Sequence, residues 1–258
     1  MKRLLIIAIA SLLCSSSLTA KDNKSTDDLG QWAESELAKY PETVDGVKVY
    51  YPAPDEDGKL SVSDLIDIEG KSKTAIFTNA LVYIYDNFDS ENEVIESIDY
   101  ESKRFIIARK LKQGSGKNTT AYEYISAFQI ADGILSFVSY NIRAEYREKG
   151  ILPRKLDIEK LKPQENTRHR ELVEEFSFLN SKILKEMSDY ISSTTPESIT
   201  HWDDIKEGNA VKGMNKTEVK LALGCPYSER VSGKRTKWMY DNNSVVIFTD
   251  GIVTAVMY

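Results

Sequence analysis

Histidines and cysteines are the residues of this chain that most readily bind metals or act as nucleophiles, and its 258 residues contain two of each. We expect His169, which lies among arginines near the start of a helix, to be solvated. His201 is followed closely by two aspartates, but one imidazole beside carboxylates matches no usual metal-ligand spacing. We therefore interpret Asp203 or Asp204 as the N-cap of a short helix. This pattern predicts no metal site and no cofactor.

Nucleophilic catalysis has little support in the sequence. There is no Gly-x-Ser-x-Gly segment, and residues 114–119 favour a turn over a phosphate-binding loop, because Leu111 stands where the first glycine should be. Cys225 lies between an expected helix and a strand, and is either a small buried side chain or a reactive thiol. The sequence neither predicts nor excludes a catalytic pair of carboxylates of the glycosidase type, since it does not give their separation in space. We predict no catalytic residue.

The first 20 residues have the pattern of a secretory signal peptide. Lys2 and Arg3 precede an apolar run over residues 4–14, and small or polar residues continue to Ala20. A bilayer-spanning helix needs about 20 apolar residues, so no transmembrane span is predicted. We expect cleavage after Ala20 and a periplasmic or extracellular protein, with association to the outer membrane as a further option. The alternative is a lipid anchor at Cys14, although no small residue precedes it.

Composition and charge narrow the classes of partner. Apolar residues make up 41% of the chain and charged residues 29%, which is typical of a globular protein. The net charge is -6, and loss of the two basic signal residues would leave 40 acidic against 32 basic side chains, or -8. An acidic protein has no field that attracts nucleic acid, so we expect none as a partner.

Periodicity predicts an α+β fold for the larger part of the chain. In order, we expect a strand over 60–68, a helix over 73–88, strands over 93–100, 104–112, 121–131 and 134–146, a charged connection over 147–167, and a helix over 169–191. Antiparallel strands in series with two amphipathic helices imply a curved sheet with both helices on one face. Asp132 and Gly133 give the strongest hairpin signal.

The strand over residues 121–131 has two distinct sides. The bulkier side, which we expect to face the helices, holds Tyr122, Tyr124, Phe128 and Ile130. The other side, which we expect on the open face of the sheet, holds Glu123, Ile125, Ala127 and Gln129. An open sheet face is either a docking surface for a partner or simply solvated.

The last part of the chain predicts a small helix followed by a β-meander. Asn215 and Glu218 form a capping-box pattern, and Gly224 ends the helix. Four strand-like runs follow, over residues 227–231, 235–240, 244–249 and 252–258. The aromatic side chains of Trp238 and Tyr240 alternate along one strand, and they form either part of a ligand platform or part of the core.

Both parts resemble known families. Residues 68–73 and 81–84, with the order of elements over 60–191, resemble a secreted Bacteroidetes family of unknown function with a TATA-binding-protein-like fold; that fold name implies no DNA binding. The C-terminal part resembles the BamE/SmpA/OmlA-like envelope domain, which is related in shape to beta-lactamase-inhibitor-protein repeats. The residues that carry this resemblance are Ile205, Gly208, 213–219, 223–226, 238–240 and 246–253. These resemblances imply protein-binding or scaffold roles.

The sequence thus predicts a signal peptide (1–20), an N-terminal extension (21–43), a TBP-like domain (44–191), a linker (192–200) and a BamE-like domain (201–258). We expect a non-enzymatic, exported protein of the cell envelope that binds an unidentified envelope protein. The alternative is a periplasmic enzyme, or a glycan- or small-ligand-binding protein, with its site at the domain junction. A soluble inhibitor of another enzyme is a third hypothesis.

Overall fold

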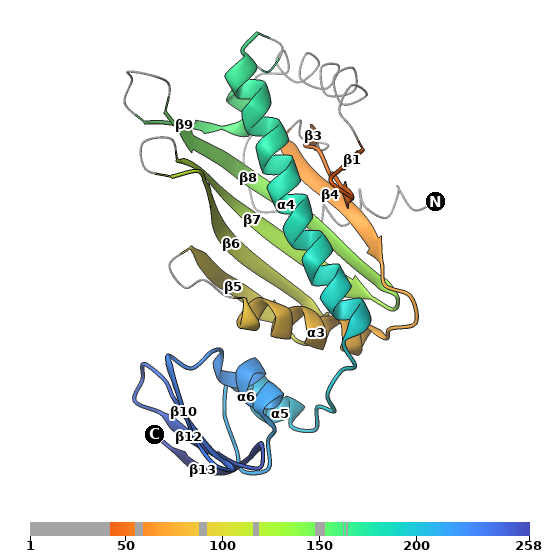
Figure 1. Cartoon of the computed structure of the whole chain (residues 1–258). Helices are drawn as coiled ribbons and strands as arrows, with labels where there is room; N and C mark the ends of the chain where they lie inside the picture. Colours follow the sequence, from red (N-terminus) through yellow and green to blue (C-terminus); the bar gives the residue numbers. More distant parts are fainter. Residues whose placement is uncertain are drawn as a thin grey trace, which may run out of the picture. The chain divides into compact units, whose positions relative to one another are not determined.

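The computed structural model describes residues 42–54, 59–87, 92–115, 119–147, 153–161, 163 and 165–258. The expected signal peptide lies outside the described residues. The chain divides into two compact units, residues 1–76 with 89–189, and residues 77–88 with 190–258 (Figure 1). No helix in the described part of the chain is long and apolar enough to cross a membrane.

The first unit is built around a seven-stranded antiparallel sheet with the order β3-β4-β8-β7-β6-β5, and β9 pairs with the end of β8 (Figure 1). The α+β class and the large antiparallel sheet are therefore confirmed. A two-stranded hairpin comes before the sheet. The strands are β1 (Thr43–Val44), β2 (Val47–Lys48), β3 (Ala53–Pro54), β4 (Leu60–Asp67), β5 (Glu93–Asp99), β6 (Arg104–Gln113), β7 (Thr120–Ala131), β8 (Ile134–Tyr146) and β9 (Arg154–Asp157).

Two predictions about the segment after β8 are wrong. The charged connection contains β9 and a short 3-10 helix, η2 (Ile158–Lys160), because the backbone of β9 pairs with β8 despite its polar sequence. His169 is not solvated but only 9% exposed, and its Nε2 lies 2.9 Å from the Tyr146 hydroxyl. A partner on β8 explains how the polar ring is accommodated in the interior.

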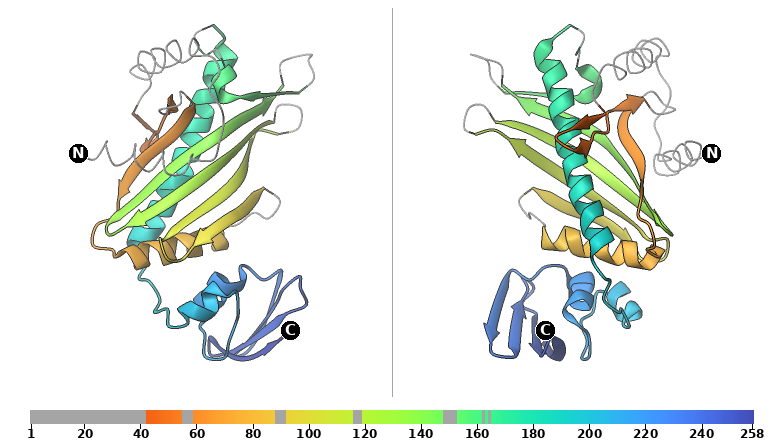
Figure 2. Two further views of the ribbon diagram at one scale, coloured as in Figure 1. Left: turned by 180° about the vertical axis from the view of Figure 1, so that it is seen from behind. Right: turned by 45° about the vertical axis from the view of Figure 1, so that its right-hand side comes forward.

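Helix α4 (Thr167–Ser193) packs along one face of the sheet (Figure 2). Its Phe176 ring lies 5.6 Å from the ring of Tyr122 and 5.1 Å from that of Tyr124, and its Glu175 accepts a hydrogen bond from the Tyr122 hydroxyl. The side of β7 that we expected to face a helix does so at these two tyrosines. We call the opposite side the open face; no described helix of this unit covers it (Figure 2, left).

The second unit contains a separate four-stranded antiparallel sheet in the order β10-β11-β12-β13. Its core holds the rings of Trp238 and Phe248, whose centroids are 4.7 Å apart. From residue 77 onward α3 also belongs to this unit, and Asn79 donates to the carbonyl of Thr194 at 2.9 Å. The elements are α3 (Lys73–Asp86), α5 (Trp202–Lys206), α6 (Lys216–Leu223), β10 (Ser228–Ser232), β11 (Arg235–Met239), β12 (Val245–Thr249) and β13 (Ile252–Met257).

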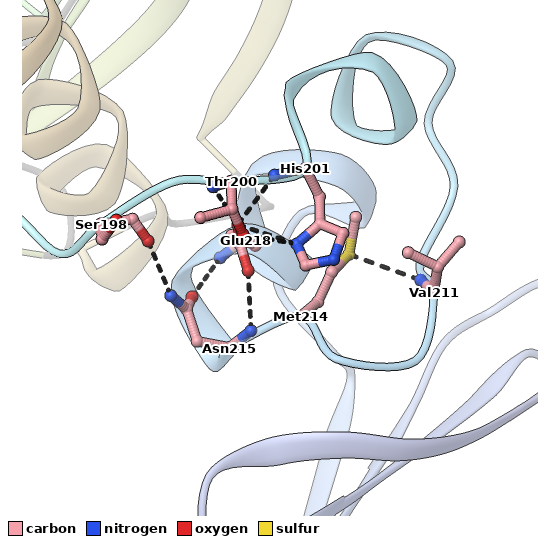
Figure 3. Close-up of polar contacts among 7 residues, drawn as sticks. All are labelled: Ser198, Thr200, His201, Val211, Met214, Asn215 and Glu218. Carbon is pink, nitrogen blue, oxygen red and sulfur yellow. Dashed lines mark hydrogen bonds and ion pairs between the residues drawn. The ribbon is translucent and has the colours of Figure 1, made fainter.

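The N-terminus of α6 forms the predicted capping box (Figure 3). The Asn215 side chain accepts from the backbone N–H of Glu218, and the Glu218 carboxylate accepts from the backbone N–H of Asn215 at 2.9 Å. Glu218 also accepts from the backbone N–H groups of Thr200 and His201, at 2.6 and 3.0 Å. This carboxylate thus fastens the segment before α5 to the start of α6.

The predicted N-cap of α5 is wrong. His201 occupies the N-cap position, and Asp203 and Asp204 lie in the first turn, where their charges still favour the positive end of the helix dipole. Helix α6 ends as expected at Gly224, whose φ of 78° falls in the region that glycine adopts without strain.

Candidate interaction surface

The cross-strand register arranges the open face of the large sheet in rows, each running across several strands. One row is apolar and consists of Val94, Ala108, Ile125 and Tyr140. The next row, in the direction of the β7–β8 turn, is also largely apolar and contains Ile106, Ala127 and Val138. Together the two rows make an apolar band across the sheet.

On the other side of the apolar band the rows are charged. The adjacent row alternates in sign across four strands, and consists of Lys110, Glu123, Arg143 and Asp157. The row beyond it consists of Lys112, Ala121, Glu145 and Lys155. Because opposite charges directly across strands attract each other, the alternating row stabilises this register.

A β-bulge in β8 makes this arrangement possible. Tyr140 and Arg143 are three residues apart, so in a regular strand their side chains would point to opposite faces. The register with β7 shifts between Glu123 and Ile125, and Asn141 has a φ of 52°. The extra residue returns Arg143 to the open face, where it lies opposite Glu123.

We call the two charged rows together the charged band. A hollow of about 400 Å³ lies at the boundary between the apolar band and the charged band. Its apolar lining comes from Val94, Ala108 and Ile125, and its charged lining includes Lys110, Glu123 and Arg143. The side chain of Val94 is 56% exposed. Among the described residues of the first unit, no other large hydrophobic side chain is exposed to this extent. A second hollow of about 210 Å³ shares Lys110 and is lined by Lys112, Glu145 and Arg147.

The two carboxylates of the alternating row are each held by two cations. Lys155 and Lys110 both bind Glu123, the latter at 3.2 Å, and they hold the pKa of its carboxyl below the usual value. Lys160 and Arg143 bind Asp157 at 2.7 and 2.9 Å, and they lower its pKa in the same way. Both carboxylates are therefore ionised at neutral pH.

The four residues of β7 that were predicted to form the open face differ in how exposed their side chains are. Glu123 and Ile125 line the hollow. Ala127 shares their side of the strand but is only 2% exposed, because a small side chain is covered by its neighbours in the row. Gln129 is half-buried, and its amide donates to the carbonyl of Ser102 at 3.0 Å. The usable surface is thus centred on Glu123 and Ile125.

Trp238 and Tyr240 are buried, so their side chains do not form a surface for a partner. They are 2% and 7% exposed, and the Tyr240 hydroxyl lies 3.4 Å from the carbonyl of Gly224. Of the two interpretations that the alternation allowed, core packing describes both residues.

Sequence reasoning missed Val94, Lys110 and Arg143 as residues of this surface. A signal existed in part, because charges recur at every second position at residues 110 and 112 on β6 and at residues 143 and 145 on β8. Alternation of this kind places charges on one side of a strand. It does not say which strands lie side by side, so the row across four strands emerged only from the register.

No family model matches the chain, and no curated protein matches it. Two solved structures are similar to it. One is a TBP-like protein from Parabacteroides distasonis ATCC 8503, at 14% identity and a TM-score of 0.48, with 55% of this chain and 98% of that chain covered. The other is a DUF4468 family protein from Bacteroides ovatus ATCC 8483, at 16% identity and a TM-score of 0.41, with 57% of this chain and 93% of that chain covered.

Proposed function

We propose that this protein is an exported, non-enzymatic binding protein of the cell envelope, and that it captures a protein partner on the open face of its large sheet. The observation that supports this most directly is the hollow between the apolar and charged bands. Its lining includes the exposed side chain of Val94, and exposed apolar surface rimmed by polar residues is typical of sites that bind another protein. The signal-peptide pattern supports export.

The finer family relations belong to the same proposal. We propose that residues 44–191 form a TBP-like domain with two helices on one face, and that residues 201–258 form a BamE-like envelope domain. The support for the second relation is its sequence motifs, including the capping box at Asn215 and the helix stop at Gly224. Envelope domains of this kind point to protein-binding roles, in line with the proposed use of the open face.

Site-specific photo-crosslinking in the native cells tests the proposal. A photoreactive amino acid replaces Val94 in the hollow, and a matched protein carries it at Val231 on β10, which is 65% exposed. We expect one reproducible partner at position 94 that is absent at position 231. Adding Ile125→Arg to the first protein should abolish this product, because a charge then occupies the apolar lining.

Equal products at both positions, or a product that survives Ile125→Arg, would contradict the proposal. A thermal melt of each variant controls for folding. Ile125 is partly exposed, so its replacement should change stability by less than about 1 kcal/mol.

A further inference from the structure

The proposed surface has a chemistry that identifies its ligand more closely, and this inference rests on the proposed function. The apolar lining of the hollow comes from Val94, Ala108 and Ile125. Its charged lining has three cations, Lys110, Arg143 and Arg109, against two carboxylates, Glu123 and Glu93, and Arg109 pairs with Glu93 at 2.7 Å. A ligand in the hollow must therefore combine an apolar group with a group that suits cations.

The charges around the hollow favour an anionic ligand. Counted with Lys160, which binds Asp157, the two charged rows contain five cations and three carboxylates. The charged band thus has a positive balance within a protein whose net charge is -6. Arg143 binds Asp157 through Nε, and a guanidinium has five N–H donors, so this side chain retains donors for a second carboxylate.

The spacing of the rows favours an extended peptide. Ile125 and Glu123 are two residues apart on β7, and so are Ala108 and Lys110 on β6, which separates the apolar and charged rows by about 6.7 Å. Side chains at alternate positions of an extended peptide have the same spacing. A peptide lying along the strands can therefore place one side chain on each row.

We infer that the open face binds an extended acidic segment of a partner protein in which an apolar residue and two carboxylate residues occupy alternate positions. The apolar side chain enters the hollow against Val94 and Ile125. The first carboxylate meets Lys110 and Arg143, and the second meets Lys112 and Lys155 in the next row. Charge complementarity sets the direction of the peptide as well as its register.

Fluorescence anisotropy with the full mature chain tests this inference. The probe is a short fluorescein-labelled peptide with leucine, glutamate and glutamate at alternate positions and threonine between them. An isomer of the same composition with these three residues adjacent serves as the control peptide. We expect the alternating peptide to bind, and the isomer to bind at least roughly tenfold more weakly.

Two variants and one matched control locate the site. The double variant K110Q/R143Q should weaken binding of the alternating peptide by roughly tenfold, and added salt should weaken binding to the unaltered protein. R230Q/K237Q, which removes two cations that are cross-strand neighbours on the small sheet, should leave binding unchanged.

Equal affinity for the two peptides would overturn the inference, as would unchanged binding by K110Q/R143Q. Crosslinking at position 94 separates the two proposals. If a partner is captured there but the alternating peptide does not bind, only the acidic-segment inference fails. If neither peptide nor partner binds, the proposed function fails as well.

Discussion

The buried carboxylate of Glu218 offers the sharpest test of how the second unit is stabilised. Glu218 is 1% exposed and accepts hydrogen bonds from the backbone N–H groups of Thr200, His201 and Asn215 (Figure 3). Replacement by glutamine keeps the shape of the side chain but removes its charge and turns one acceptor into a donor. At least one buried N–H group then faces another donor.

The expected cost of Glu218→Gln is about 3 kcal/mol. Losing one hydrogen bond to a buried N–H costs about 1–3 kcal/mol, and the remaining bonds change from charge-assisted to neutral. For a unit of this size the loss corresponds to a fall in melting temperature of more than about 10 °C. Tryptophan fluorescence follows this unit well, since Trp202 and Trp238 both lie in it.

Glu229→Gln is the matched control. Glu229 is partly exposed and pairs with Lys216 at 3.2 Å, and an exposed pair of this kind contributes about 0–1 kcal/mol. The reasoning would be refuted if the two variants lowered the melting temperature equally. That result would mean that the buried hydrogen bonds to Glu218 contribute no more than an exposed ion pair.

The pH dependence of the same variant has a defined sign. Burial raises the pKa of the Glu218 carboxyl, but hydrogen bonds from Thr200, Asn215 and His201 outweigh it, so the pKa lies below its ordinary value of 4.5. A carboxyl with a depressed folded-state pKa stabilises the fold above its unfolded pKa, and this contribution is lost as the pH falls through the folded pKa. The difference between unaltered protein and Glu218→Gln should therefore narrow below about pH 4.5.

Two further predictions concern Cys225 and a pair of buried serines. Cys225 is exposed and not the small buried side chain that the sequence allowed, but desolvation by its neighbours raises the pKa of its thiol, which donates to the carbonyl of Tyr85 at 2.7 Å. Alkylation by iodoacetamide should therefore be several-fold slower than that of free cysteine at neutral pH; equal rates would contradict this. The hydroxyls of Ser126 and Ser139 lie 2.8 Å apart and both residues are buried, so either alanine substitution alone should cost about 1–2 kcal/mol in urea unfolding. The double variant should cost less than the two singles together, and strict additivity would argue against the hydrogen bond.

Elements with strong local signals could be predicted from the sequence. The helix over Lys73–Asp86 has apolar residues at a regular helical spacing, and the β7–β8 hairpin follows from Asp132 and Gly133, whose φ is 69°. In both cases the deciding physics is contained in a few neighbouring residues. For the same reason, the sequence could predict that Tyr122 and Tyr124 lie on the side of β7 that faces a helix.

The remaining features depend on partners that are distant in the sequence. Strand β9 has the sequence Arg-Lys-Leu-Asp, which has little intrinsic preference for a strand. It forms a strand because its backbone pairs with the edge of β8. His169 is buried because Tyr146 lies opposite it. The hollow depends on the bulge at Asn141, without which Arg143 would not share a face with Ile125. A sequence pattern contains no register, so none of these could be derived from it.

The second unit includes a segment that lies inside the first unit in the sequence, and this has a consequence for folding. Asn79 donates a hydrogen bond to the carbonyl of Thr194, which lies 115 residues later in the sequence. The carbonyl of Tyr85 accepts a hydrogen bond from Cys225, which lies 140 residues later. During synthesis α3 therefore leaves the ribosome long before these partners exist. Closing loops of this length costs chain entropy before any contact compensates for it, which slows folding. Completion of the second unit is thus a late step of folding.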